Sequence, residues 1–595
     1  MQNFFEAPKS TLIYVFRIND SEHEGCLKIG ETSLTDDSVN IFSLQPNSKI
    51  LNASARKRID QYTQTAGVSY ELLYTESALF LRGKGFGYFN DKEVHQVLLR
   101  SGIKRKEFRG VNNRGTEWFQ TDLGTVIRAI QAVKEGRKSL TSQEITLEQS
   151  PIAFRPEQRD AINKTLKRFK KGNQMLWDAK MRFGKTLSAL QLVKEMGAER
   201  TLILTHRPVV DNGWFEDFGK IFYDTPSYLY GSQKKGESFV SLLRMQAQKK
   251  ICFVYFASMQ DLRGSETVGG KFDKNDVLFS TSWDFIIVDE AHEGTQTPLG
   301  QAVIKELFKG KTKMLQLSGT AYNLYNNFNG EEEIYTWDYI MEQRAKAAWD
   351  STHFGDPNPY AGLPKLNIFT YNLGELYTKY TDDEVAFNFR EFFRVNDEGC
   401  FLHESDVRSF LNLLCSAAEN SRYPYACEEY RAIFRHTLWM LPGTKSAKAM
   451  SQLLQSHPVF QHFKVVNVAG AGDEDVENDD ALKMVESAIG DDPETTRTIT
   501  LSCRRLTTGV SVRAWTGVLM LSGSYNTAAS AYMQTIFRVQ TPATINGKVK
   551  EECYVFDFAP DRTLQVLATV PKVSTKAGKT TESQKKGTAS KKSRE

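Results

Sequence analysis

Residues 179–186 read AKMRFGKT, and this stretch decides how the middle of the 595-residue chain is built. It has the spacing of a phosphate-binding loop, with alanine at the position of the first glycine. An apolar run at residues 174–177 precedes the loop, and residues 186–196 follow it with helical spacing. A strand that turns through such a loop into a helix presents backbone N–H groups and the positive helix end to phosphate groups. The stretch therefore predicts a nucleoside triphosphate site in an α/β fold.

Three residues of this loop have the chemistry that such a site needs. We expect Gly184 to let the backbone approach the phosphates closely. Lys185 is expected to reach the β- and γ-phosphates, and the hydroxyl of Thr186 is expected to bind Mg²⁺. ATP and Mg²⁺ are therefore the predicted cofactors.

A second motif supports the first. Residues 284–292 read DFIIVDEAH, an apolar strand that ends in two carboxylates. Buried carboxylates are costly unless they are paired or bind a metal. We therefore expect Asp289 to hold Mg²⁺, directly or through water, and Glu290 to orient and deprotonate the attacking water.

Apolar strand patterns alternate with helical segments around both motifs. Such alternation predicts a parallel sheet that is covered by helices on both faces. A second unit of the same kind follows, so we expect two parallel-sheet domains. The expected strands of the first unit are 174–177, 201–205, 251–254 and 285–288, and those of the second are 437–441, 464–468, 498–501, 518–521 and 554–558.

From about residue 154 to residue 558 the chain resembles a superfamily 2 helicase with a DEAH box. Beside the two motifs above, the resemblance is carried by residues 154–158 (FRPEQ), 205–208 (THRP), 317–321 (LSGTA), 506–510 (LTTGV) and 532–540 (YMQTIFRVQ). It implies two RecA-like domains with ATP bound between them. It also implies that Arg155 and Gln158 bind the nucleotide, with Gln158 contacting the base.

The last of these motifs supplies a candidate arginine finger. The resemblance implies that Arg538 stabilises transition-state charge across the cleft between the domains. Many relatives carry a second arginine three positions later, where this chain has Thr541. Arg513 and the pair at residues 504–505 are alternatives, although each could equally be a surface or salt-bridge residue.

The first 134 residues contain a different set of motifs. Tyr14 lies in an apolar strand pattern, residues 28–30 (KIG) follow a polar turn, and Arg58, Glu93 and residues 117–119 (EWF) come later. This order resembles a GIY-YIG nuclease of the phage type. The resemblance implies a small α/β domain in which Tyr14 helps to activate water, Arg58 neutralises the phosphate and Glu93 holds Mg²⁺.

Departures from the nuclease pattern leave alternatives open. The first motif lacks its glycine, and Lys28 replaces the second tyrosine, where it could bind phosphate as a point charge. His95 and Tyr62 are candidate assistants, but a histidine in such a pattern is more often part of the core. The domain could therefore be an active nuclease, an inactive recognition module, or an unrelated fold in which Tyr14 belongs to the sheet core.

The composition is that of an ordinary soluble globular protein. Hydrophobic residues make up 40% of the chain, and no stretch approaches the ~20 apolar residues of a membrane span. The seven cysteines include no CxxC pair, which indicates neither zinc nor disulfides and favours the cytoplasm. The net charge of +4 arises in the tail from Lys572 onward, because the rest holds 68 basic and 70 acidic residues.

These patterns divide the chain into six segments. They are a GIY-YIG-like nuclease domain (1–134), a linker (135–150), a first RecA-like domain (151–330), an insertion or connector (331–430), a second RecA-like domain (431–562) and a basic disordered tail (563–595). The predicted function is an ATP-dependent DNA helicase or translocase coupled to a metal-dependent endonuclease, of a restriction or phage-defence kind.

Two other functions fit the same motifs. One is a repair or recombination helicase with the same chemistry. The other is a DNA-binding ATPase switch whose N-terminal domain is inactive and only recognises structure. DNA is the expected partner, with RNA as the alternative, and no membrane is expected. No base-reading module is evident, so a further C-terminal domain or a partner subunit could supply specificity.

Overall fold

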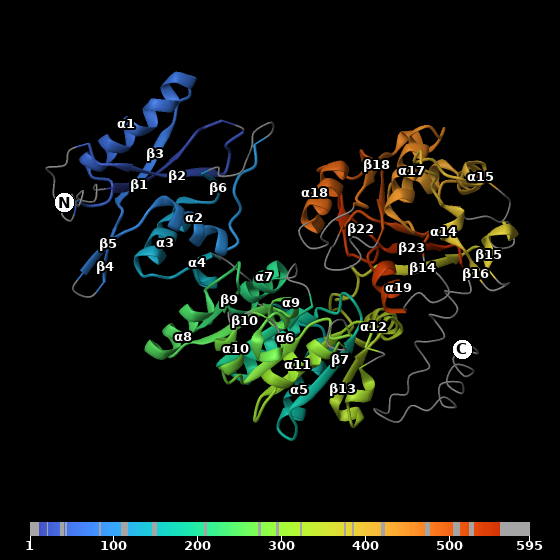
Figure 1. Ribbon diagram of the computed structural model, residues 1–595, viewed down its shortest axis with the longest axis horizontal. Coiled ribbons are helices and arrows are strands. Elements are labelled where there is room, and N and C mark those ends of the chain that lie inside the picture. Colours follow the sequence, from blue (N-terminus) through green and yellow to red (C-terminus); the bar gives the residue numbers. More distant parts are fainter. Residues whose placement is uncertain are drawn as a thin grey trace.

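The computed structural model arranges the chain in three bodies (Figure 1). We call them the N-terminal body (11–145), lobe 1 (152–352) and lobe 2 (365–559). Residues 207–208, the pair at 504–505, the motif at 506–510 and the basic tail lie outside the described residues, as does the side chain of Tyr62. The described residues are 11–20, 22–35, 41, 44–82, 85–108, 117–145, 152–206, 211–269, 271, 275–292, 297–321, 324–373, 377–382, 386–417, 423–470, 477–503, 512–522 and 529–559.

The N-terminal body is built on an antiparallel sheet with the strand order β3-β1-β2-β6. Successive residues of a strand face opposite sides of the sheet, so Tyr14 packs toward α1 while Ile13 packs toward α2 and α3. The elements are β1 (Thr11–Arg17), β2 (Cys26–Ser33), α1 (Lys49–Ala66), β3 (Glu71–Ser77), β4 (Leu79–Arg82), β5 (Gly85–Tyr88), α2 (Asp91–Arg100), β6 (Trp118–Gln120), α3 (Leu123–Lys134) and α4 (Ser142–Ile145).

Lobe 1 contains a parallel sheet with the strand order β13-β7-β12-β11-β8-β10-β9. The phosphate loop follows β7 and the DEAH residues follow β11, so both lie at the carboxyl ends of strands, where α/β sheets bind ligands. The elements are α5 (Pro156–Phe169), β7 (Gln174–Ala179), α6 (Lys185–Met196), β8 (Arg200–Thr205), α7 (Asp211–Phe222), β9 (Tyr228–Gly231), α8 (Phe239–Gln248), β10 (Cys252–Ser258), α9 (Met259–Arg263), α10 (Asp276–Ser280), β11 (Phe285–Val288), α11 (Pro298–Leu307), β12 (Lys313–Ser318), β13 (Ile334–Trp337) and α12 (Tyr339–Thr352).

Two apolar cores cover the two faces of this sheet. All four side chains of β11 are buried. Ile287 packs with Trp177 and Leu190 on one face, while Ile286 packs with Leu202 and Val303 on the other. Each such fully buried side chain stabilises the fold by about 1.5–3 kcal/mol relative to an exposed one. Burial on both faces is why these strands are continuous apolar runs in the sequence.

Lobe 2 repeats this plan with a parallel sheet in the order β14-β23-β20-β17-β19-β18. Its faces are again covered by two cores, one containing Trp439 and the other Leu438. The principal elements are β14 (Lys365–Thr370), α14 (Phe389–Phe392), α15 (Glu404–Leu414), α16 (Glu428–Ile433), β17 (His436–Met440), α17 (Thr444–Gln455), β18 (Lys464–Asn467), α18 (Glu477–Ile489), β19 (Thr498–Ser502), β20 (Gly517–Met520), α19 (Ala529–Ile536) and β23 (Glu552–Asp557), with the short hairpins β15 (Thr381–Asp382) with β16 (Ala386–Phe387) and β21 (Thr544–Ile545) with β22 (Lys548–Val549).

The α/β fold class with two RecA-like parallel sheets is thereby confirmed. The segment 331–430, expected as an insertion or connector, contributes to both lobes. β13 pairs with β7 at the edge of lobe 1, and β14 pairs with β23 at the edge of lobe 2. Its aromatic residues, among them Phe392 and Phe410, pack into the core of lobe 2. No helix in the described part of the chain is both long and apolar enough to span a membrane.

Candidate active site

The phosphate loop has the backbone geometry that its sequence predicts. Gly184 adopts a left-handed conformation, with φ of 85°, and immediately precedes α6. A Cβ atom at this position would lie 2.4 Å from the Gln158 side-chain nitrogen, so both the backbone conformation and the contact with Gln158 favour glycine. The Nζ of Lys185 donates to the Ala179 carbonyl at 2.7 Å, which holds the amine over the loop. Thr186 lies at the start of α6, beside Lys185.

Arg155 and Gln158 form hydrogen bonds to the phosphate loop. The backbone N–H of Arg155 donates to the Gln158 side-chain oxygen at 2.8 Å, which caps the start of α5. The Gln158 side-chain nitrogen donates to the Phe183 carbonyl at 2.8 Å, and an Arg155 Nη donates to the same carbonyl at 2.7 Å. Both side chains therefore touch the loop itself, and their direct contact with a nucleotide remains a prediction.

The two carboxylates of the DEAH motif follow β11. Trp214 Nε1 donates to Asp289 Oδ2 at 3.1 Å, and the Glu290 backbone N–H donates to Oδ1 at 2.9 Å. Burial and the neighbouring Glu290 raise the pKa of Asp289 to about 6, while Lys185 acts in the opposite direction. A carboxylate in this environment is suited to a cation. Glu290 has a left-handed φ of 46°, a strained conformation that is common at functional sites.

His292 joins three motifs at the boundary between the lobes. Its Nδ1 lies 2.9 Å from the Ser318 hydroxyl, and its Nε2 lies 2.9 Å from the side-chain nitrogen of Gln534 in lobe 2. Because an amide nitrogen can only donate, Nε2 of His292 accepts and Nδ1 carries the proton. The Ser318 hydroxyl also accepts from the Thr320 backbone N–H at 3.1 Å. A movement of lobe 2 would therefore act, through His292, on both the carboxylate motif and residues 317–321.

Arg538, the candidate finger, is buried at the same boundary. Burial and the nearby Arg182 lower its pKa to about 9, and Glu290 acts in the opposite direction. The guanidinium of Arg538 thus lies within electrostatic reach of residues from both motifs of lobe 1. The alternative Arg513 is exposed. This geometry favours Arg538, whose catalytic role remains a prediction.

A buried polar network around Lys180, which the motifs did not indicate, also joins the lobes. Lys180 Nζ lies 2.8 Å from one carboxylate oxygen of Glu342 on α12 and donates to the Gln540 side-chain oxygen of lobe 2 at 2.9 Å. Gln540 in turn donates to the Pro364 carbonyl at 2.9 Å. Breaking a buried pair leaves an uncompensated charge, which typically costs about 3–5 kcal/mol. The phosphate loop is therefore anchored to both α12 and lobe 2.

The donor set fits ATP with Mg²⁺. Gly184 leaves the start of α6 without a side-chain cap, so the helix N-terminus faces the loop. Lys185 would supply the cation for the phosphates, and the Thr186 hydroxyl and the Asp289 carboxylate are oxygen ligands of the kind that Mg²⁺ prefers. Bound Mg²⁺ would neutralise charge on the phosphates.

In the N-terminal body, Tyr14 and Gly30 are neighbours across β1 and β2. A Cβ atom on Gly30 would lie 2.5 Å from the Tyr14 hydroxyl oxygen, so the ring requires glycine there. Tyr14 is buried in the core beneath α1. Lys28, one pleat away on the same face, lies 3.5 Å from a carboxylate oxygen of Glu117. The structure thus brings together the first two motifs of the nuclease resemblance and its last.

Arg58 and Glu93 lie on two different helices, α1 and α2. Arg58 lies on α1 and lines an open cavity of about 430 Å³ together with Glu31. Glu93 is exposed and closes the capping box of α2, where its carboxylate accepts from the Asn90 backbone N–H at 3.1 Å. Among the described residues that line the cavity, Glu93 and Tyr14 are absent.

Glu31 is a candidate that sequence reasoning missed. Partial burial and the nearby Asp91 raise the pKa of its carboxyl group, and the Asp91 backbone N–H donates to it at 3.3 Å. Its position directly after Gly30 was the available signal.

His95 is buried, with Nε2 2.9 Å from the Ile29 carbonyl. Within the described ranges, no group of three or more His, Cys, Asp or Glu side chains is placed to hold a metal ion.

The N-terminal body is fastened to lobe 1 by Arg100 at the end of α2. Its guanidinium donates to the backbone carbonyls of Gly236 at 2.6 Å, of Ser232 and Gln233 at 2.9 Å, and of Lys235 at 3.3 Å. The Gly236 backbone N–H donates back to the Arg100 carbonyl at 2.9 Å. We call this set of contacts the Arg100 clamp.

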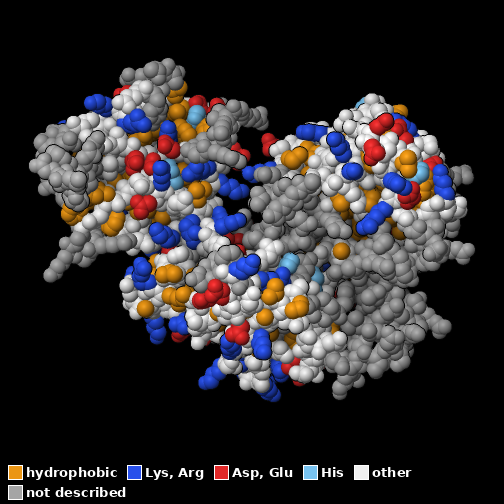
Figure 2. Space-filling view, in the orientation of Figure 1, with side chains coloured by type: hydrophobic (Ala, Val, Ile, Leu, Met, Phe, Trp, Pro, Cys, Tyr) orange, Lys and Arg blue, Asp and Glu red, His pale blue; other side chains and the backbone are white. Residues whose placement is uncertain are grey.

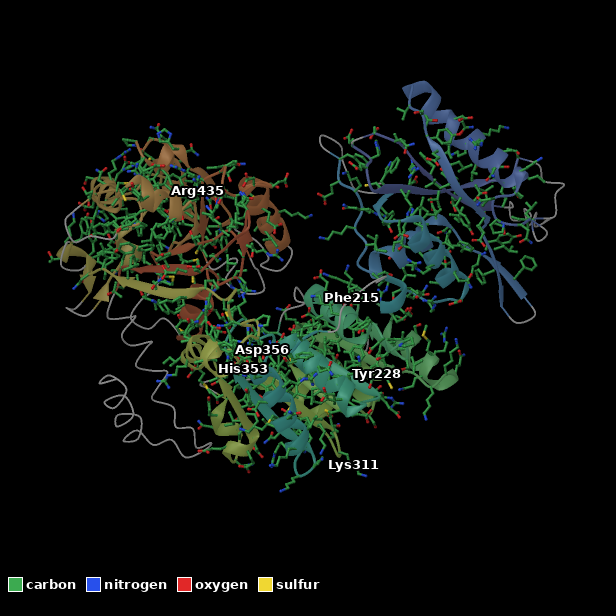
Figure 3. All side chains as sticks on the ribbon, turned by 180° about the vertical axis from the view of Figure 1, so that it is seen from behind. Phe215, Tyr228, Lys311, His353, Asp356 and Arg435 are labelled. Atoms are coloured by element: carbon green, nitrogen blue, oxygen red, sulfur yellow. The ribbon has the colours of Figure 1, made fainter. Side chains whose placement is uncertain are left out.

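Glu237 adds a second fastening next to the clamp. Its buried carboxylate accepts the backbone N–H groups of Lys138 at 2.5 Å and Ser139 at 2.9 Å. Phe215 on α7, labelled in Figure 3, lies on the side of lobe 1 that faces the N-terminal body. A Cβ at Gly102 would come within 3.0 Å of its ring. The hydrogen bonds that the Glu237 carboxylate accepts are charge-assisted, and such bonds are about twice as strong as neutral ones.

A central hollow of about 1680 Å³ lies where the three bodies meet. It extends from Thr186 and Asp289 of the ATP site to the edge of the N-terminal body. Figure 2 shows Lys and Arg side chains around the space between the N-terminal body and lobe 2. Lys483 of lobe 2 forms an exposed ion pair with Glu107 at 3.3 Å, a contact that contributes little stability. Basic residues of the lining are Lys104, Arg105, Lys106, Arg137, Arg182, Lys220, Lys235 and Lys483, and acidic ones are Glu107, Glu216, Asp217, Glu237, Asp289 and Glu486.

The Arg100 clamp gives a direct prediction. Arg100→Ala removes the donors to four carbonyls and is expected to weaken the attachment by about 2–4 kcal/mol. Hydrogen–deuterium exchange should then become faster at residues 99–103 and at residues 232–237 together. Arg128→Ala is the control, because Arg128 binds Thr125 within the N-terminal body. Equal exchange in Arg100→Ala and the wild-type protein would contradict the role of the clamp.

Comparison with known proteins finds sequence similarity to restriction enzymes. Residues 151–323 match the family model "Type III restriction enzyme, res subunit". The matched segment contains the phosphate loop, the DEAH residues and the motif at 317–321. A protein of Mycoplasma pneumoniae named as a putative type II restriction enzyme and methyltransferase (C-terminus) is 26% identical over 460 residues, which is 66% of this chain and 62% of that protein.

The chain therefore spans about three fifths of the length of this curated relative. Among solved structures, an ATP-dependent Type ISP restriction-modification enzyme, LlaBIII, bound to DNA matches with 15% identity and a TM-score of 0.44, over 70% of this chain and 28% of the other. The sequence similarities support a restriction-type helicase of superfamily 2. They leave the nuclease resemblance of the first 134 residues, and the role of each site residue, as predictions.

Proposed function

We propose that the chain is an ATP-dependent DNA translocase or helicase that is coupled to a metal-dependent endonuclease. The observation that carries the proposal is that Arg538 of lobe 2 is buried at the lobe boundary, within electrostatic reach of Glu290 of lobe 1. ATP bound on the phosphate loop would be enclosed by catalytic groups from both lobes. Closure of the lobes on ATP and reopening after hydrolysis would move them along nucleic acid.

Each residue of the ATP site has a defined task in this proposal. Lys185 binds the β- and γ-phosphates, while Thr186 and Asp289 hold Mg²⁺. Glu290 orients the water and takes its proton, and Arg538 neutralises charge that develops on the γ-phosphate. His292 couples this site to lobe 2, because its ring contacts both Ser318 of lobe 1 and Gln534 of lobe 2. Gln158 and Arg155 keep the loop in place beside the base.

The N-terminal body is the proposed endonuclease. The packing of Tyr14 on Gly30, with Lys28 and Glu117 nearby, supports the resemblance to a GIY-YIG nuclease. Arg58 would neutralise the cleaved phosphate, and Glu93 would hold Mg²⁺. The Arg100 clamp keeps this body on lobe 1, so that DNA handled by the motor passes a nuclease at a constant distance.

The central hollow is the proposed path of the nucleic acid between these two activities. Lys104 and Lys106 lie on its N-terminal rim and Lys483 on the rim of lobe 2. Lysines at both rims can neutralise backbone phosphates without regard to sequence. The weak Glu107–Lys483 ion pair would open at little cost as the lobes move. DNA is the proposed partner, with RNA as the alternative.

Restriction or phage defence is the biological role that we propose, in the cytoplasm. The match of residues 151–323 to the restriction-enzyme family supports it. Recognition of a sequence would then come from a further C-terminal domain or from another subunit. A repair helicase, or an ATPase switch with an inactive N-terminal body, would share the motor and differ in cleavage.

One experiment tests these alternatives together. ATP hydrolysis and strand cleavage are measured side by side on methylated and unmethylated duplex DNA, single-stranded DNA and RNA, with and without Mg²⁺. We expect DNA to stimulate hydrolysis and cleavage to require Mg²⁺. Hydrolysis without any cleavage would favour the ATPase switch, and no nucleic-acid stimulation of hydrolysis would contradict a translocase.

Glu93→Gln separates the nuclease role from the structural role of that residue. Glutamine can still close the capping box of α2, but it lacks the charge that binds Mg²⁺. We expect cleavage to fall by about 100-fold with unchanged thermal stability and unchanged ATP hydrolysis. Lys92→Gln, on the neighbouring exposed position, is the control. Full cleavage by Glu93→Gln would refute Glu93 as the metal ligand and direct attention to Glu31.

A further inference from the structure

Arg182 of the phosphate loop reaches across the ATP site to lobe 2. Its Nη2 donates to the Thr541 hydroxyl at 2.7 Å, and that hydroxyl donates to the Arg538 carbonyl at 2.8 Å. Thr541 occupies the position where relatives of superfamily 2 carry a second arginine. A guanidinium is therefore present at this place, but it comes from the opposite lobe.

The backbone of Arg182 has a strained conformation. Its φ is 69°, in the left-handed region that favours glycine. For a residue with a side chain this costs about 1–3 kcal/mol and persists only where the surroundings enforce it. Arg155 contributes to that enforcement, because its Nη2 lies 3.3 Å from the Arg182 carbonyl. Strain of this kind is concentrated at ligand sites.

The charges around Arg182 favour a phosphate ligand. Burial lowers the pKa of both guanidinium groups, and Arg182 is close enough to Arg538 to lower the pKa of Arg538 further. Arg182 also lines the hollow that contains Thr186 and Asp289. Two adjoining cations beside a phosphate loop are best neutralised by an anion of high charge.

Lys180, the other cation of the loop, is engaged differently. Its amine is buried with the Glu342 carboxylate and the Gln540 amide oxygen. That network satisfies Lys180 structurally, whereas Arg182 lines the hollow together with Thr186 and Asp289. The contrast matters because both residues occupy positions that the phosphate-loop motif leaves open.

We propose that Arg182 is a second phosphate-contacting arginine of the ATP site, which the phosphate loop of lobe 1 supplies in place of an arginine at position 541. The inference rests on the proposed ATP hydrolysis. In that reaction water oxygen bonds to the γ-phosphorus as the bond to the β–γ bridging oxygen breaks. The electron pair leaves with ADP, and Glu290 takes the water proton. Arg182 neutralises negative charge on the γ-phosphate oxygens together with Arg538.

The test compares four variants of the full chain by DNA-stimulated ATP hydrolysis. Arg182→Ala is expected to lower kcat by about 100-fold, the effect of losing one preorganised donor to a transition state. Arg182→Ala with Thr541→Arg should recover at least about 10-fold of that loss, since it restores a guanidinium from lobe 2. Arg159→Ala is the control, because Arg159 forms an exposed pair with Glu195. Lys185→Ala reports whether the chain is an ATPase of the proposed kind.

A second measurement separates phosphate contact from a contact that merely joins the lobes. Arg182→Ala should weaken binding of ADP–aluminium fluoride, a mimic of the transferring phosphate, much more than binding of ADP. Equal loss for both ligands, or a kcat within about 3-fold of the wild-type value, would overturn the inference. Failure of the Thr541→Arg rescue in a protein with wild-type thermal stability would overturn it as well. If Lys185→Ala keeps full activity, the proposed function itself fails, and that result is distinct from the others.

Discussion

ATP hydrolysis stimulated by DNA should fall about 1,000-fold when Lys185 is replaced with alanine. The amine of Lys185 lies 2.7 Å from the Ala179 carbonyl and so projects over the loop where the phosphates are expected. Alanine removes the charge that holds the β- and γ-phosphates in both the ground state and the transition state. We expect a loss of ATP affinity as well as of kcat, measured by nucleotide binding and by steady-state hydrolysis.

The matched control is Lys309→Ala, an exposed lysine of lobe 1 that pairs with Glu306. It changes the net charge equally and should leave hydrolysis unaltered. Cleavage by the N-terminal body distinguishes two forms of coupling. If cleavage stops in Lys185→Ala, DNA must be delivered by the motor. If cleavage persists, the nuclease acts on DNA that it meets by diffusion. Unchanged ATP turnover in Lys185→Ala would refute the assignment of the phosphate loop.

The cores of both lobes could be predicted because buried parallel strands leave a clear local pattern. Residues 285–288, an apolar run before two carboxylates, form β11, and residues 437–441 overlap β17. The segment 331–430 has no comparable pattern. Its strands β13 and β14 lie at sheet edges. Only half of β13 is buried, β14 is at most half-buried, and the apolar run of each is short. Long-range pairing, which local sequence does not encode, assigns one strand to each lobe.

The site was predictable where a motif fixes a residue and not where contact depends on the arrangement of the lobes. Gly184 and Lys185 follow from the loop motif alone. Arg182 and Lys180 occupy positions that the motif leaves open, and their partners Thr541 and Gln540 lie more than 350 residues away. Only the packing of lobe 2 against the loop reveals that both cations cross between the lobes.

The N-terminal body shows the same limit. The register of β1 and β2 brings Tyr14 onto Gly30, a pairing that the order of the motifs alone did not specify. Glu93 was predicted as a metal ligand, but its position at the third residue of α2 makes it a capping residue too. The capping pattern was present in the sequence as Asn90 followed three residues later by Glu93. The Arg100 clamp has no local signal, because its acceptors are backbone carbonyls.

Glu290→Gln is expected to have the largest effect on turnover, a loss of about 10,000-fold in kcat. Glutamine has the shape of glutamate but cannot take the proton of the attacking water. Because Asp289, Thr186 and Lys185 are unchanged, ATP should still bind with an affinity close to that of the wild-type protein. The variant should therefore remain loaded with ATP, with the lobes closed on it.

This combination can be measured directly. Filter binding or fluorescence with ATP should show retained affinity, and a mobility assay should show DNA held more tightly in the presence of ATP than in its absence. Glu266→Gln, an exposed position in lobe 1, is the control. Glu290→Gln also removes the attraction between Glu290 and Arg538. This change should alter the closed state of the lobes less than replacement of Arg538 itself does. Hydrolysis by Glu290→Gln within about 10-fold of the wild-type rate would exclude Glu290 as the base, and the proton would then have to be taken by another group at the lobe boundary.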